Sequence, residues 1–277
     1  MFAAFPTWYA TMFSGFYIAL LLLLVLLIVR VLSFEWREKS ESPAWRRVWA
    51  WANAIGSVGA SLIWGIALAS LLHGVPLDSK GDFDGDFADL FTGYSVLAGV
   101  TVVLVFASHG ATYLTIRTRG DLCDRAARAA RVLSVAAVLV GSGFLAWTVA
   151  VAVDRNDKDV FPPVLPAALG ACALVLALIF VYRSRSGLAF GATAFGAVLL
   201  VATLFTSLYP RVMVSDPDFG NSLTVSGAAS AHYTLAVMTV VAVIIAPLIL
   251  LYQGWTYHVF RQRVGGEHVE AQPGLGD

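Results

Sequence analysis

Residues 16–34, FYIALLLLLVLLIVRVLSF, decide the class of fold. A helix rises 1.5 Å per residue, so this stretch is about as long as the hydrocarbon core of a bilayer is thick, about 30 Å. Its only charged residue is Arg30, close to its end. The stretch therefore predicts a helix that crosses a membrane.

The whole composition agrees with that prediction. Of the 277 residues, 58% are hydrophobic and 13% are charged, whereas charged residues make up about 25% of a soluble domain. The net charge of +0 gives no reason to expect a nucleic-acid partner. The apolar segments are too long, and alternate too little, for the roughly ten-residue strands of a β-barrel. We expect an all-α integral membrane protein, a polytopic bundle of seven transmembrane helices over residues 8–34, 46–73, 89–116, 126–153, 164–183, 187–209 and 231–260.

The charges between these segments predict the orientation of the bundle. Arginine and lysine gather in every second connection, namely Arg37, Lys39, Arg46, Arg47, Arg117, Arg119, Arg125, Arg128, Arg183 and Arg185, and again after the last helix at Arg261 and Arg263. The other connections are acidic: DSKGDFDGDFAD at 78–89, DRNDKD at 154–159 and SDPDFGNS at 215–222. Basic loops stay cytoplasmic. The N-terminus is therefore predicted outside and the C-terminus inside, with a membrane domain over 1–264 and a disordered cytoplasmic tail over 265–277.

The first apolar segment does not look like a signal peptide. No lysine or arginine precedes it, whereas a signal peptide has a basic region there and a small-residue cleavage site after the apolar stretch. We interpret it as an uncleaved helix that runs from outside to inside. A first helix of that orientation is unusual, so the sequence suggests that further helices precede it in the complete protein.

His109, in VFASHGATYL, is the only ionisable residue well inside a predicted helix. A histidine at this depth can be a haem ligand, a proton relay, or a neutral side chain that bonds a neighbouring helix. Haem held by two histidines needs a second deep histidine, and the sequence has none, so we favour polar packing and keep the relay as the alternative. Asp82, Asp84 and Asp86 alternate but lack the glycine position and the final glutamate of a calcium-binding EF-hand loop. We expect no metal site and no catalytic residue in this chain.

Small residues and one proline predict how the helices pack. Gly56 and Ala60 are four residues apart, as are Gly187 and Gly191, a spacing that lets helices approach closely. Pro247 lies in the middle of the last helix and should kink it. No helix centre carries Asp, Glu, Lys or Arg, and the cost of such a charge, about 2.5–3.5 kcal/mol, is usually accepted only for ion paths. This absence weighs against an ion-coupled transporter.

Several stretches resemble subunit II of the cytochrome bd quinol oxidases. They are MFAAFPTWYATMFSGFY at 1–17, FEWREKSESPAWRRVWAWANAIGS at 34–57, WGIALASLLHGVPLD at 64–78, HGATYLTIRTRGDL at 109–122 and SLTVSGAASAHYTLAVMTVVAVIIAPLILLYQGWTYHVFRQR at 222–263. They occur in the order and spacing of that family and cover nearly the whole chain. Members normally have two more helices in front, with GFDFG-like and WDGNE-like motifs. Neither motif occurs here, and we expect a start codon assigned too late.

The resemblance implies a function and partners. It implies a multi-pass subunit in a prokaryotic cytoplasmic membrane, part of a quinol:oxygen oxidoreductase of aerobic respiration. Subunit II would bind no cofactor itself. It would stabilise the haem-bearing subunit I, which carries haems b and d, and help to form routes for protons and oxygen. Quinol would be the substrate of the complex. The resemblance also allows membrane lipid, quinone and a small third subunit as further partners. A transporter or channel subunit without a redox role remains the alternative.

Overall fold

The computed structural model describes residues 1–156 and 162–260, so the predicted tail over 265–277 lies outside the described residues. Seven of its helices are long and apolar enough to cross a membrane, as the sequence predicts. They are α2 (Tyr17–Trp36), α3 (Pro43–His73), α4 (Gly93–Arg117), α5 (Asp121–Asn156), α6 (Val164–Tyr182), α7 (Ser186–Leu208) and α9 (His232–Val259). The short elements are α1 (Pro6–Gly15), η1 (Arg37–Lys39), η2 (Phe87–Leu90), β1 (Arg211–Met213), η3 (Phe219–Asn221), β2 (Leu223–Thr224) and α8 (Val225–Ala228).

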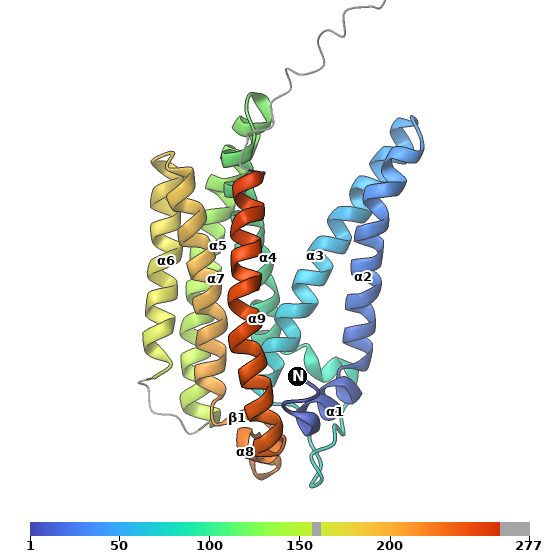
Figure 1. Cartoon of the computed structure of the whole chain (residues 1–277), viewed down its shortest axis with the longest axis vertical. Helices are drawn as coiled ribbons and strands as arrows, with labels where there is room; N and C mark the ends of the chain where they lie inside the picture. Colours follow the sequence, from blue (N-terminus) through green and yellow to red (C-terminus); the bar gives the residue numbers. More distant parts are fainter. Residues whose placement is uncertain (157–161, 261–277) are drawn as a thin grey trace, which may run out of the picture.

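Four of the long helices form one group. α4 packs on α5 and α7, and α6 packs on the same two helices, so the four close into a bundle. α2 and α3 form an antiparallel pair that meets α4 at one end and leans away from it at the other (Figure 1). The acidic connections after α3 and α7 lie together at the end where α1 and α8 are found (Figure 1).

The crossing of α3 and α4 is built on two glycines. A Cβ atom on Gly65 would lie 2.7 Å from the Cα of Gly99, which leaves no room for a side chain. Gly56 lies against α2 in the same way, because its Cβ would be 2.7 Å from the carbonyl oxygen of Leu26. By contrast, among the described residues a Cβ placed on Gly187 or Gly191 would meet no atom within 4 Å beyond its own stretch of helix. A packing role for these two glycines stays a prediction that concerns a neighbour outside this chain.

The first helix differs from the prediction. In place of one helix over 8–34, the chain forms α1 and α2, which are divided at Phe16. The ring of Phe83 occupies the space that a Cβ on Gly15 would need, and Thr11 Oγ1 donates a hydrogen bond to the carbonyl of Gly81 at 2.8 Å. Phe16 is fully buried and packs edge-on against Phe83. The loop after α3 therefore docks at the bend.

A small hairpin follows α7. β1 pairs antiparallel with β2, and Val75 forms a parallel bridge with Ser215, so the two connections at this end share backbone hydrogen bonds. The guanidinium of Arg211 lies 3.9 Å from the centre of the Phe219 ring. The sequence predicts only an acidic loop here, because segments this short carry no recognisable alternation of apolar residues.

Candidate functional site

His109 lies at the seam between α4 and α7. Its Nδ1 is 2.7 Å from Thr193 Oγ1, and its ring stacks on Phe190 with centroids 4.3 Å apart. Thr193 also donates to the carbonyl of Phe190 at 2.9 Å. A hydroxyl has one proton to donate, so in this arrangement the imidazole donates from Nδ1 and its Nε2 is the acceptor.

His109 is the first of three side chains along one face of α4. Tyr113 follows one turn later, 5.6 Å from Phe190 between ring centres, and Arg117 comes after another turn, 5.5 Å from the centre of the Tyr113 ring. Arg117 Nη1 donates to the carbonyl of Phe260, just beyond α9, at 2.7 Å. The i, i+4, i+8 spacing could have indicated this row, but the sequence cannot say which helix it faces.

Two buried hydroxyl contacts set the rotation of α4 against α5. Ser108 and Ser134 meet at 2.9 Å, and Tyr94 meets Thr148 at the same distance. All four residues are at most 1% exposed. The ring of His73, at the end of α3, stacks on Tyr94 at 5.6 Å. These contacts hold α4 so that His109 faces α7, and sequence reasoning missed them because each joins helices far apart in the chain.

The acidic loop over residues 78–91 uses its carboxylates to order its own backbone. Asp78 accepts hydrogen bonds from the amides of Asp82 and Lys80, both at 2.8 Å. The Asp82 amide contributes most to lowering the pKa of the Asp78 carboxyl below its usual value, and the Lys80 amide and ammonium add to it. Asp89 accepts from the amide of Asp86 at 2.7 Å. Within residues 1–156 and 162–260, no three His, Cys, Asp or Glu side chains gather to hold a metal ion.

α9 is held at its ends but not along its length. At one end the amide of Ser230 donates to the carbonyl of Ala4 at 2.8 Å, and at the other Arg117 bonds Phe260. Between these contacts, 0% of its most apolar stretch is buried by the described residues, against 56% for α3. Pro247 lies inside this helix, which continues through it. Whether the proline bends α9 stays a prediction.

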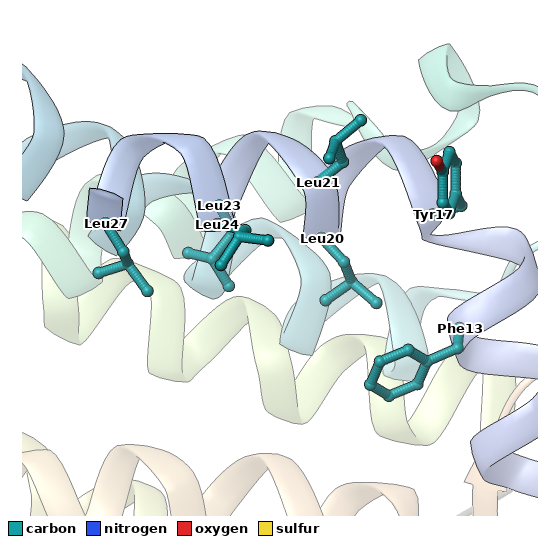
Figure 2. A pocket seen from close by; sticks show the side chains of 7 residues that line it. All are labelled: Phe13, Tyr17, Leu20, Leu21, Leu23, Leu24 and Leu27. Atoms are coloured by element: carbon teal, nitrogen blue, oxygen red, sulfur yellow. The ribbon is translucent and has the colours of Figure 1, made fainter. Parts of the chain in front are cut away.

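α2 presents a second apolar face. Only 11% of its most apolar stretch is buried. A groove of about 390 Å³ runs along it, and Leu20 and Leu27 of α2 point to the same side as Phe13 of α1 (Figure 2). The seven residues that line the groove are Phe13, Tyr17, Leu20, Leu21, Leu23, Leu24 and Leu27. Apart from the Tyr17 hydroxyl, this lining is apolar, so the groove suits an apolar neighbour.

The long helices and the polar contacts between them define a polytopic helical membrane protein that has, among the residues that the structure describes, one histidine in the middle of a span. Its sequence matches the family model of cytochrome bd terminal oxidase subunit II over residues 1–260. The chain belongs to this family. The resemblance seen in the sequence is thereby confirmed, and the comparisons give no support to the transporter alternative.

Curated relatives agree with the family assignment. The chain is 37% identical over 269 residues to cytochrome bd ubiquinol oxidase subunit 2 of Bacillus subtilis, with 95% of this chain and 78% of that protein covered. It is 34% identical over 303 residues to cytochrome bd-I ubiquinol oxidase subunit 2 of Escherichia coli K12, with 98% and 80% covered. A probable cytochrome oxidase subunit 2 of Haemophilus influenzae is 30% identical over 301 residues, with the same coverage. The chain is thus a multi-pass membrane subunit of a terminal oxidase.

Proposed function

We propose that this chain is the haem-free subunit of a bd-type complex that oxidises quinol and reduces oxygen to water, and that it acts by packing against and stabilising the haem-bearing subunit. The quinol substrate is proposed from the names of the Bacillus subtilis and Escherichia coli relatives, which are ubiquinol oxidase subunits. The observation that carries the packing role is α9, which is anchored at both ends and uncovered between them.

The donor set of this chain does not fit a haem held by two histidines. His109 is the one histidine in the middle of a span among the described residues, while His73, His232 and His258 lie at helix ends. We therefore place haems b and d in the partner subunit, and no step of the reaction is assigned to a residue of this chain.

Exposure alone would not make α9 a protein interface, because apolar side chains also face lipid. α6 shows the difference. It has exposed leucines and yet packs along its length on α5 and α7, whereas α9 packs along its length on no other described helix. Helices in a bilayer associate by close packing and hydrogen bonds rather than by the hydrophobic effect. A helix that its own chain fixes only at the ends therefore suits packing by helices of another subunit.

A matched pair of tryptophan substitutions tests this role. Ala242 lies on α9 and Ala168 on α6, and both are exposed. We expect A242W to reduce the haem that co-purifies with the tagged chain, because the larger ring pushes the partner away. A168W should leave it unchanged, because that ring would meet lipid. Equal haem content in the two variants, at equal membrane insertion, would show that α9 is not the contact surface.

We further propose that His109 acts in polar packing, with proton relay as the alternative. Its bond to Thr193 and its stack on Phe190 support packing, because both join α4 to α7. H109A should then lower the thermal midpoint of the complex and leave turnover per haem unchanged. If turnover falls while haem content and midpoint are kept, the relay is the better account. T193V, which removes the same hydrogen bond but keeps the imidazole, is the control.

A further inference from the structure

A polar pocket opens at the end of the bundle where the arginines gather. It has a volume of about 240 Å³ and lies between α4, the first turns of α5, the turn after α6 and the start of α7. That is several times the volume of a water molecule, about 30 Å³. The α4–α5 turn extends beyond the α6–α7 turn (Figure 1), so the pocket lies at the level where the shorter pair of helices ends.

Two opposite charges line this pocket. Asp124 and Arg131 both lie on α5 and both contribute to the wall. They are seven residues apart, which is about 10 Å along a helix, and neither forms an ion pair with another described residue. A carboxylate and a guanidinium that face one cavity without pairing are available to a ligand that carries both charges.

The hydroxyl groups of the pocket divide into acceptors and donors. Thr112 and Thr115 donate their protons to backbone carbonyls of α4, each at 2.7 Å, so their oxygens can only accept a further bond. Ser184 and Ser186 make no side-chain hydrogen bond to a described residue, so their hydroxyls are free to donate. The wall can therefore bind an anion and a protonated amine together.

We propose that this pocket binds the phosphoethanolamine headgroup of a membrane phospholipid. Arg131 and the hydroxyls of Ser184 and Ser186 bind the phosphate, and Asp124 accepts hydrogen bonds from the primary ammonium. Depth supports this assignment, because Arg131 lies seven residues further into the span than Asp124. In a phospholipid the phosphate is likewise closer to the acyl chains than the amine. Arginine-containing pockets between transmembrane helices at a membrane surface bind the phosphates of lipid headgroups.

The two opposite charges also disfavour the commonest other headgroups. A phosphatidylglycerol has no cation for Asp124, and its negative charge leaves that carboxylate unpaired. A phosphatidylcholine has a cation, but its trimethylammonium group has no proton to donate to the carboxylate. The pocket is therefore expected to prefer the ethanolamine lipid over both.

Native mass spectrometry of the purified complex, after exchange into nanodiscs of one defined lipid, tests this preference. We expect retention of phosphatidylethanolamine at least about tenfold above that of phosphatidylcholine or phosphatidylglycerol, which is the lower end of the effect of one hydrogen bond to a charged group. R131Q should lower the retention of all three lipids. D124N, nearly the same shape, should keep the phosphate site and abolish the preference for ethanolamine. R128Q, on the same helix but outside the pocket wall, should behave as the unmodified protein.

Each outcome bears on the proposal, and none depends on oxidase activity. Unchanged selectivity in D124N would overturn it, as would R131Q retaining as much lipid as R128Q. Soluble glycerophosphoethanolamine is added as a competitor to separate the two sources of the headgroup. If it displaces the lipid fully at equal concentration, the pocket takes the free compound and the lipid assignment is wrong. Thermal midpoints of all variants show that the complexes compared are folded.

Discussion

Replacing Gly65 by alanine should push α3 away from α4. A Cβ at this position would lie 2.7 Å from the Cα of Gly99 and 2.9 Å from the carbonyl oxygen of Ala98. Carbon atoms pack at about 3.5–4.0 Å, so the two helices must separate by about 1 Å. Both contacts are with backbone, which cannot rotate away as the end of a flexible side chain can.

The size of the effect follows from two opposed contributions. Overpacking of a close contact costs about 1–3 kcal/mol, and alanine gains up to about 1 kcal/mol over glycine inside a helix. The net expectation is a loss of about 1–2 kcal/mol. For a chain of this size that lowers the midpoint of thermal unfolding by roughly 2–8 °C.

Thermal unfolding followed by intrinsic tryptophan fluorescence measures this shift. Gly143, on α5, is the matched control, because in the described part of the chain a Cβ placed there would meet no atom within 4 Å beyond its own stretch of helix. G143A should therefore keep or raise the midpoint, while G99A should lower it as G65A does, since its Cβ would meet the carbonyl of Leu62 at 2.7 Å. If G65A and G143A unfold at the same temperature, α3 and α4 do not cross at these glycines.

Three further predictions follow from other contacts. Y94F removes a buried hydroxyl hydrogen bond and should lower the free energy of unfolding by about 1 kcal/mol. The loss is measured as a lower thermal midpoint, and an unchanged midpoint would show that this hydrogen bond does not stabilise the protein. The folded loop lowers the pKa of the Asp78 carboxyl below its unfolded value, near 3.9. The ionised carboxylate therefore stabilises the loop at any pH above that value, and the stabilisation is lost as the pH falls through the lower pKa of the folded state. Hydrogen exchange at the Asp82 amide should thus speed up below about pH 4 relative to its intrinsic rate, and D78N should remove that pH dependence. G15A should displace the Phe83 ring and speed exchange in the loop after α3, and F83A should restore tolerance to G15A; without that rescue, the bend has another cause.

The seven spans could be predicted because a bilayer imposes one length and one composition on every helix that crosses it. The bend at Phe16 could not. In the sequence Gly15 is one more small residue in an apolar stretch. The helix divides there because the ring of Phe83, far along the chain, packs against Gly15. The orientation with the N-terminus outside rests on the charges of the loops alone and stays a prediction.

His109 shows the same limit within the candidate site. The sequence predicts that His109 lies deep in its helix with no second deep histidine, and it leaves polar packing and proton relay as the two possible roles. Its partner Thr193 is 84 residues away on another helix. The spacing of residues along α4 or α7 does not predict that these two side chains meet. Gly65 and Gly99 were missed for a similar reason, because each lies on a helix whose small residues also face other directions.

The contact of Ser230 with Ala3 can form only late in synthesis. Ser230 Oγ donates to the carbonyl of Ala3 at 2.6 Å across 227 positions of sequence. At about 5–20 residues per second, the ribosome needs roughly 10–45 s to make that intervening chain. Throughout this interval Ala3 lacks this partner, because Ser230 has not yet been made. A chain that stops before Ser230 cannot form this contact, so the end of the molecule that holds α1 and α8 closes only after α7 has been made.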